Sequence, residues 1–185
     1  MHNDELWQEY GFNGAPLENG GRSPEKGNLK PEERDARRAV TGNATIWFYR
    51  HGENGTEVLF QKRSKYVDRF PEKWDISAGG HINYQETPLE AAIRESKEEI
   101  GADITAEDLR FCGSVFTGCR LTHYFFCDWT GKKDNFHFDD AEVAEVKWVP
   151  LASADEFRKK YAKEPLANED EYIIEMLKHW LIEYD

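Results

Sequence analysis

Short apolar runs bounded by turn residues dominate the chain from residue 43 onward. They alternate with polar positions or read as continuous stretches of β-branched and aromatic residues, which is the pattern of β-strands. The expected strands are residues 45–49, 57–61, 109–116, 121–127 and 143–149. Helices are expected at residues 153–162 and from residue 168 onward, the last with an apolar face of Ile173, Leu177, Trp180 and Leu181.

Residues 88–100 carry the clearest helix signal in the chain. Thr87, Pro88 and Glu90 form a capping box with proline at the first helical position, and Gly101 supplies the left-handed residue that ends many helices. The stripe that would pack on the core consists of Leu89, Ala92, Ile93, Ser96 and Ile100. With strands before this helix and further helices at the end, the order predicts an α/β (α+β) fold with helices on both sides of a mixed sheet.

Carboxylates crowd this helix and the turn before it; they are Glu86, Glu90, Glu95, Glu98 and Glu99. On a helix, Glu95, Glu98 and Glu99 lie at positions i, i+3 and i+4 and therefore share one face. Like charges at this spacing destabilise a helix unless a cation lies among them, and oxygen ligands favour Mg²⁺ or Mn²⁺. Upstream, Gly79 and Gly80 let the backbone approach a ligand closely. A solvated acidic face is the plain alternative for any such helix.

The spacing of residues 80–102 resembles the Nudix box, G-x5-E-x7-R-E-U-x-E-E-x-G-U, where U is a bulky aliphatic residue. Every Gly, Glu and Arg of the pattern is present, whereas Ser96 and Ala102 depart from it at two packing positions. The resemblance implies a Nudix-like α/β/α sandwich with a mixed β-sheet and Mg²⁺- or Mn²⁺-dependent hydrolysis of a diphosphate, such as a nucleoside diphosphate linked to another group. It also implies that Glu95, Glu98 and Glu99 are metal ligands, that Glu86 is an outer or bridging carboxylate, and that the Gly80 carbonyl is a further ligand. Arg94 would orient the glutamates.

A basic stretch before the box offers contacts for phosphate. Arg63 and Lys65 lie where a predicted strand ends, and His81 directly follows the two glycines. A guanidinium contacts a phosphate or carboxylate by two parallel hydrogen bonds, which makes Arg63 a candidate substrate-binding residue together with Lys65 and His81. An ordinary solvated edge is the alternative for the two basic residues, and a structural role is the alternative for His81.

The same stretch is similar to the Nudix subgroup nearest to isopentenyl-diphosphate isomerase. In that isomerase a catalytic cysteine follows the tryptophan, whereas Ala78 and Gly79 stand at the corresponding places here. The isomerase's second catalytic group, a glutamate in a later hairpin, has no counterpart in residues 119–123. A hydrolase is therefore favoured, with an isomerase as the alternative and a non-catalytic nucleotide- or protein-binding module as the third hypothesis.

The base that activates water is expected beyond the box, in the acidic stretch of residues 139–145. Val146 and Trp148 share one face of the strand that follows, and Glu142 shares it too if the extended backbone reaches that far. Glu145 would then point the other way. We predict Glu142 as the base and Glu145 as the second candidate, with a solvated acidic loop as the alternative.

Residues 1–42 differ in character from the rest and predict an N-terminal hairpin and flexible linker, followed by a Nudix domain at residues 43–185. Residues 6–10 suit a strand, residues 20–30 a loop rich in Gly, Pro and charge, and residues 31–39 a short helix. An exchange of this segment between two copies would give a homodimer.

Composition restricts the classes of partner and the cellular location that we expect for this protein. The net charge of −12 argues against a nucleic-acid polymer, which leaves a small-molecule diphosphate as the expected partner. No apolar run is long enough to span a membrane, and no signal peptide is evident at the N-terminus. The odd number of cysteines (Cys112, Cys119 and Cys127) is typical of reduced structural thiols, so a cytoplasmic protein is expected.

Overall fold

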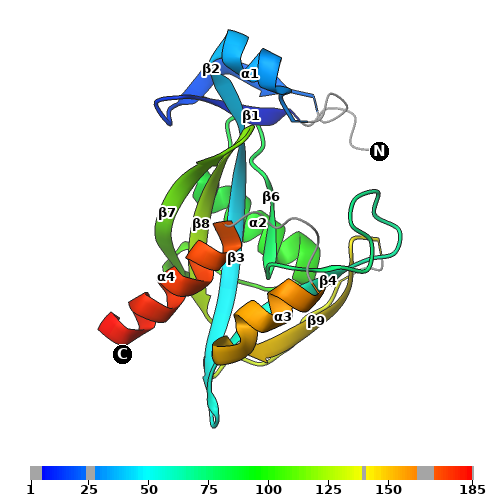
Figure 1. Cartoon of the computed structure of the whole chain (residues 1–185), viewed down its shortest axis with the longest axis vertical. Helices are drawn as coiled ribbons and strands as arrows, with labels where there is room; N and C mark the ends of the chain where they lie inside the picture. Colours follow the sequence, from blue (N-terminus) through cyan, green and yellow to red (C-terminus); the bar gives the residue numbers. More distant parts are fainter. Residues whose placement is uncertain (1–5, 24–27, 139–140, 162–168, 185) are drawn as a thin grey trace.

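The computed structural model describes residues 6–23, 28–138, 141–161 and 169–184 of the chain (Figure 1). Its strands are β1 Trp7–Gly11, β2 Pro16–Arg22, β3 Ala39–Gly52, β4 Gly55–Arg63, β5 Trp74–Asp75, β6 Ala78–His81, β7 Leu109–Thr117, β8 Arg120–Asp128 and β9 Val143–Pro150. Its helices are α1 Pro31–Arg37, α2 Pro88–Ile100, α3 Ala154–Tyr161 and α4 Glu169–Tyr184, with 3-10 turns η2 Ala106–Asp108 and η3 Leu151–Ser153.

Strand β3 is the centre of a mixed sheet that contains nine strands among the described residues. One edge of β3 runs parallel to β8, which in turn pairs with β7. The other edge pairs antiparallel with β1, β6 and β4 at successive positions along β3. Strand β4 continues the sheet to β5 and β9. Among the described strands, β6 pairs only with β3, so its second edge is open to side chains from α2.

Both faces of the sheet are covered, as the sequence predicts for this fold class. Ile46 and Phe48 of β3 lie in a core cluster that includes Ala91, Ala92 and Ile100 of α2. Trp47 and Tyr49, on the other face, lie in a second cluster with Ala154 of α3 and with Ile174, Leu177 and Leu181 of α4. Figure 1 shows α3 and α4 on the near side of the sheet and α2 behind it. The predicted α/β fold with a mixed sheet is therefore confirmed.

Helix α2 begins and ends where its capping residues predict. The hydroxyl of Thr87 accepts from the backbone N–H of Glu90 at 3.2 Å, and a carboxylate oxygen of Glu90 accepts from the N–H of Thr87 at 2.9 Å. At the other end, Gly101 is left-handed with φ of 67°. The helix thus has a fixed position against β6, with which it makes close contact.

The N-terminal segment extends the sheet. Strands β1 and β2 form an antiparallel hairpin, and β1 pairs with the start of β3. The loop predicted over residues 20–30 is shorter than expected, since Gly20, Gly21 and Arg22 belong to β2, and residues 24–27 lie outside the described residues. The boundary predicted between residues 42 and 43 falls within β3, and the division into two segments stays a prediction.

Two predictions near the C-terminus concern residues outside the described ranges. Residues 162–168, which include the predicted start of the last helix, lie outside the described residues, as does the side chain of Ile173. None of the helices in the described part of the chain is long and apolar enough to cross a membrane.

Candidate active site

Arg94, in the middle of α2, binds the carboxylates of the box. Its Nε and Nη2 donate to the two oxygens of Glu86 at 2.8 and 2.9 Å. Its Nη1 donates to Glu95 at 2.8 Å and to Glu98 at 2.9 Å. Nη2 also donates to the carbonyl oxygen of His81 at 3.0 Å, which ties α2 to β6. The structure therefore gathers three of the predicted carboxylates around one guanidinium.

Glu99 is buried between α2 and the sheet. Its Oε2 accepts hydrogen bonds from the backbone N–H of Gly79 at 2.7 Å and from Nε2 of Gln61 at 3.1 Å. Burial raises the pKa of Glu99 well above its usual range, and the charge of Glu95 raises it further. Gln61 was missed by the sequence analysis, because one polar residue in a strand carries no signal of the glutamate that it meets in the fold.

Glu95 packs directly against the glycine pair of β6. A Cβ added to Gly80 would lie 2.3 Å from Oε1 of Glu95, so any side chain at residue 80 would displace this carboxylate. Burial raises the pKa of Glu95 to about 7, against the lowering effect of Arg94, and the charges of Glu98 and Glu142 add to the rise. Glu95 is thus a buried carboxylate whose neighbours include more negative than positive charge.

The side chains suit a divalent cation in chemistry, although they do not form a closed cage. Within the described residues, no three carboxylate, imidazole or thiol groups stand close enough together to hold a metal ion. Glu86, Glu95 and Glu98 are turned toward Arg94 instead. All the candidate ligands are carboxylate oxygens, which Mg²⁺ and Mn²⁺ prefer. Burial is the first cause of the raised pKa values of Glu95 and Glu99 and neighbouring carboxylates are the second, and a bound cation would favour the charged form of both groups.

Of the two candidate bases, Glu142 is the one whose charge acts on the box carboxylates Glu95 and Glu99. Glu142 precedes β9, which begins at Val143, and its carbonyl accepts from the backbone N–H of Ser64 at 2.8 Å. Its charge is among those that raise the pKa of Glu99. Glu145 pairs with Lys62 in register and is exposed. Since the next residue, Val146, packs toward the α2 side of the sheet, Glu145 points away from it.

The predicted basic residues reach the edge of the site and not its centre. Nη1 of Arg63 lies 3.5 Å from a carboxylate oxygen of Asp75, and its Nε donates to the carbonyl of Arg69 at 3.1 Å. Asp75 is one of the charges that raise the pKa of Glu99, so it links Arg63 to the site. The Nζ of Lys65 lies 4.9 Å from the ring centre of Tyr66.

His81 is covered by the N-terminal segment. Its ring stacks on Trp7 with the ring centres 3.5 Å apart, and its Nε2 lies 3.1 Å from Oδ1 of Asn28. Burial lowers the pKa of His81 to about 3, and the charges of Arg120 and Arg69 lower it further. His81 is therefore neutral, with Nε2 donating to Asn28. The segment that reaches it was not predicted to approach the box.

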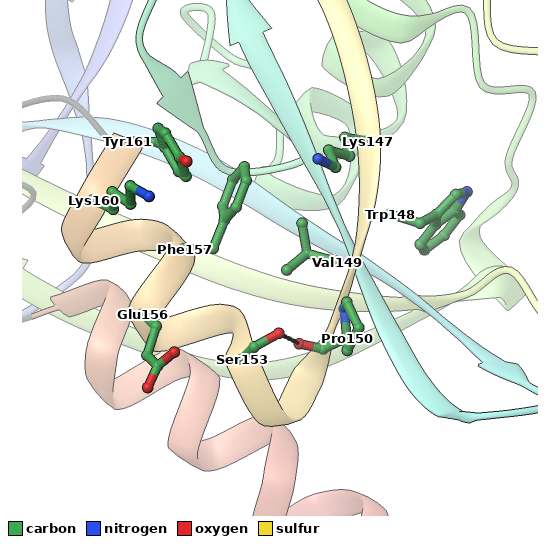
Figure 2. Close-up of a pocket in the computed structure, with 9 residues that line it drawn as sticks. All are labelled: Lys147, Trp148, Val149, Pro150, Ser153, Glu156, Phe157, Lys160 and Tyr161. Atoms are coloured by element: carbon green, nitrogen blue, oxygen red, sulfur yellow. Dashed lines mark hydrogen bonds between the residues drawn. The ribbon is translucent and has the colours of Figure 1, made fainter.

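A hollow of about 310 Å³ lies between β9 and α3. Figure 2 shows its lining, which includes Lys147, Phe157 and Tyr161. None of the predicted site residues lines it, and it lies on the face of the sheet opposite α2. The hollow is therefore separate from the predicted site residues.

Parts of this chain are similar in sequence to known proteins. A protein of Listeria innocua named as an uncharacterized Nudix hydrolase is 33% identical over 93 residues, which is 50% of this chain and 55% of that protein. An isopentenyl-diphosphate Delta-isomerase of Nocardia farcinica is 34% identical over 114 residues, 60% of this chain and 63% of that enzyme. In both cases the match spans less than two thirds of the relative's length.

Among solved structures, the protein DR0079 of Deinococcus radiodurans has a similar fold, with a TM-score of 0.66 and 20% identity, over 89% of this chain and 96% of that protein. The NUDIX domain family itself matches residues 41–175. That match includes the whole box, the central strands and the start of α4. The resemblance seen in residues 80–102 is thereby confirmed, and the chain belongs to the Nudix family.

Proposed function

We propose that this protein hydrolyses a diphosphate linkage in a small molecule, with water attacking phosphorus and with Mg²⁺ or Mn²⁺ as the cofactor. One observation carries the proposal: the guanidinium of Arg94 gathers Glu86, Glu95 and Glu98 beside the glycine pair that binds Glu99. Glu86, Glu95 and Glu99 are largely buried, which is costly in free energy for neighbouring carboxylates and is typical of functional sites.

In this proposal Glu95, Glu98 and Glu99 hold the cation, Glu86 is an outer carboxylate, and the carbonyl of Gly80 is a further ligand. When bound, the cation neutralises the diphosphate and lowers the pKa of the attacking water. Gly79 and Gln61 both donate to Oε2 of Glu99 and so fix one oxygen of this carboxylate. The chain thus sets the direction of this carboxylate before any substrate arrives.

Arg94 acts as a positioning residue. Its two parallel hydrogen bonds to Glu86 fix the plane of the guanidinium. The remaining bonds then set the carboxylates of Glu95 and Glu98 relative to that plane. Without the guanidinium these carboxylates would repel one another by a few kcal/mol at about 4 Å separation in a half-buried setting.

Glu142 is the proposed general base. It lies in a turn and not in a strand, so it is free to adjust its distance to a bound water more than a residue of the sheet is. The hydrogen bond from Ser64 fixes its backbone to the end of β4. Glu145 is the second candidate, although it points to the other face of the sheet.

The isomerase is an alternative because the Nocardia farcinica relative carries that name. The places that would hold its cysteine are unsuitable here. Ala78 is fully buried in the core, and a Cβ at Gly79 would lie 2.7 Å from the carbonyl oxygen of Ala44. A thiol at either residue would not reach a substrate without movement of the backbone, which favours hydrolysis.

A panel of diphosphate compounds with Mg²⁺ tests the proposal. We expect phosphate, pyrophosphate or nucleoside monophosphate to be released from at least one compound, and the release to stop in excess EDTA. Glu99→Gln should keep the fold and lose most of the activity, whereas Glu107→Gln, at an exposed glutamate outside the box, should behave as wild type. Undiminished hydrolysis in EDTA would show that the proposed mechanism is wrong.

A non-catalytic binding module, the third hypothesis, is decided by the same panel. Binding of a nucleotide without turnover of any compound in Mg²⁺ or Mn²⁺ would favour it. The carboxylates around Arg94 and the buried Glu99 argue against this outcome, since nucleotide binding alone does not require them. The homodimer that the N-terminal segment suggests stays a prediction.

A further inference from the structure

The hairpin of β1 and β2 is bound to the segment that leads from β6 into α2. Figure 1 shows this hairpin at one end of the long strand β3. The backbone N–H of Gln8 donates to the carbonyl of Ile82 at 2.7 Å. The N–H of Tyr84 donates to the carbonyl of Leu6 at 2.6 Å. Backbone hydrogen bonds from outside the box therefore hold the start of the box in place.

The side chain of Gln8 adds a further contact to this segment. Its Oε1 accepts from the backbone N–H of Gln85 at 2.9 Å. Its Nε2 donates to the carbonyl oxygens of Glu9 and Leu17 at 2.9 and 3.0 Å, and the residue is only 3% exposed. Because two carbonyls face one end of the amide and an N–H faces the other, only one orientation of the amide satisfies all three groups.

Gln85 has a backbone conformation that is unusual for a residue with a side chain. Its φ is 68°, in the left-handed region that glycine adopts more readily. Gln85 is exposed, so burial of its own side chain does not compensate for this conformation. The hydrogen bond from its N–H to Gln8 fixes the peptide group that precedes Gln85 and therefore stabilises the left-handed backbone.

Gln85 lies within the turn that sets the direction of Glu86. The N–H of Glu86 donates to the carbonyl of Asn83 at 2.9 Å, and Oε2 of Glu86 accepts from the N–H of Asn83 at 2.8 Å. The same Oε2 accepts from Nη2 of Arg94, and Oε1 accepts from its Nε. A change in the backbone of Gln85 would therefore move the carboxylate away from both Asn83 and Arg94.

We propose that Gln8 is a positioning residue of the active site, which holds the turn at Gln85 and through it the orientation of Glu86 and Arg94. The effect on rate rests on the proposed hydrolase function, whereas the effect on Arg94 needs no substrate. Because Gln8 is buried and binds the turn, its loss should lower kcat and leave KM largely unchanged.

The test replaces Gln8 by methionine, which is similar in length but has no amide. With Mg²⁺ and the compound of the diphosphate panel that wild type hydrolyses fastest, we expect kcat to fall about tenfold, as for the loss of one hydrogen bond. KM should stay within about twofold of wild type. In NMR spectra of the protein without ligand, the N–H of Gln85 and the Nε–H of Arg94 should exchange with solvent at least about fivefold faster than in wild type.

Two further variants separate positioning from a general loosening of the hairpin. Oδ1 of Asn13 accepts from the N–H of Ala15 at 3.1 Å in the turn between β1 and β2. Asn13→Ala, the matched control, should leave kcat and both exchange rates within about twofold of wild type. Adding Gln85→Gly to Gln8→Met should restore kcat to within about threefold, because glycine adopts the left-handed conformation without help from the hydrogen bond.

A kcat or an Arg94 exchange rate equal to that of wild type in Gln8→Met would overturn the inference. An equal loss in Asn13→Ala, or no restoration by Gln85→Gly, would also overturn it, because Gln8 would then act only on the stability of the hairpin. Should Gln8→Met fail to fold, Gln8→Asn keeps a polar amide at this position and withdraws it from Gln85 by one carbon.

The outcome for the hydrolase proposal is separate. If wild type hydrolyses no compound of the panel, that proposal fails, and the exchange of the Arg94 Nε–H alone decides the positioning role. Faster exchange in Gln8→Met than in wild type and Asn13→Ala supports the role, and unchanged exchange overturns it.

Discussion

The substitution Gly80→Ala tests the importance of the close contact between β6 and Glu95. An ideal Cβ at residue 80 lies 2.3 Å from Oε1 of Glu95 and 2.7 Å from its Oε2, both far inside van der Waals contact. Gly80 is not among the residues with positive φ, so alanine meets no backbone strain there. The whole cost of the substitution therefore falls on the carboxylate, which has to move away.

The expected loss of stability is small because the obstacle is the end of a flexible side chain. Overpacking a site costs about 1–3 kcal/mol, and a movable carboxylate places Gly80→Ala near 1 kcal/mol. In a protein of this size that lowers the melting temperature by roughly 2–4 °C. The expected loss of activity is larger, since displacing a group of the site by about 1 Å costs on the order of a hundredfold in rate.

Gly101→Ala is the matched control, because it perturbs the same helix without touching the carboxylates. Gly101 has φ of 67°, and a Cβ there would lie 2.4 Å from the carbonyl oxygen of His137. Left-handed strain of about 1–2 kcal/mol and overlap with backbone together amount to roughly 3 kcal/mol. We expect a melting temperature lower by about 6–12 °C, with kcat/KM within about threefold of wild type at temperatures where the variant is folded.

Calorimetric melting and initial rates on the best diphosphate of the panel measure the two effects separately. Gly80→Ala should lose activity and little stability, and Gly101→Ala should show the reverse. Full activity in Gly80→Ala would refute the view that the position of Glu95 matters for the reaction. An equal loss of activity in folded Gly101→Ala would show that any disturbance of α2 inactivates the protein.

The remaining predictions concern the base, the thiols, the isomerase and the carboxylates. Glu142→Gln should lower kcat strongly with little change in KM, and Glu145→Gln should not; if neither lowers kcat more than about tenfold, a box glutamate is the base. Burial raises the pKa of Cys112 and of Cys127 to about 12, so both thiols are protonated at neutral pH and iodoacetamide should label them slowly in the folded protein but readily in urea. No deuterium from D₂O should enter isopentenyl diphosphate, and rapid incorporation would contradict the preference for a hydrolase. In urea titrations Glu86→Ala should lower the free energy of unfolding by about 2 kcal/mol, because it removes two charge-assisted hydrogen bonds of Arg94. Glu98→Ala removes one exposed ion pair and should lower it by less than about 1 kcal/mol, and equal losses would contradict this ranking.

The limits of α2 were predictable from sequence because their causes are local. Thr87 and Glu90 cap the first turn through contacts three residues apart, and Gly101 ends the helix by its own backbone conformation. The orientation of the glutamates follows from helix periodicity once those ends are known. The helix ends and the shared face of the glutamates were therefore predictable from the local sequence alone.

Contacts between distant strands were not predictable in the same way. Gln61 meets Glu99 only because β4 and β6 both flank β3, and nothing near Gln61 in the chain indicates this. The extended backbone assumed for Glu142 does not hold, since β9 begins one residue later and its register with β4 shifts between Lys62 and Arg63. The hydrogen bond from Ser64 positions Glu142 instead, through an acceptor in the backbone that has no sequence signal.

In the N-terminal segment, too, the contacts between distant residues were not predictable from the sequence. Residues 20–22 look like loop because two of them are glycine, but pairing with β1 makes them strand. Trp7 stacks on His81 although 74 positions separate them in the chain. The pairing of β1 with the start of β3, together with a bridge between Trp7 and Asn83, brings that tryptophan near the box, and long-range pairing of this kind leaves no periodic pattern to detect.

The exposure of the carboxylates around Arg94 indicates which of them can exchange partners. The side chains of Glu86 and Glu95 are only 14% and 12% exposed, whereas that of Glu98 is 58% exposed. Glu86 holds the guanidinium by two bonds and Glu98 by one. A single exposed ion pair contributes about 1 kcal/mol or less, so Glu98 can leave Arg94 at little cost while Glu86 keeps the guanidinium in place. Glu98 is therefore the carboxylate that can turn from the arginine toward a bound cation without loosening the rest of the site.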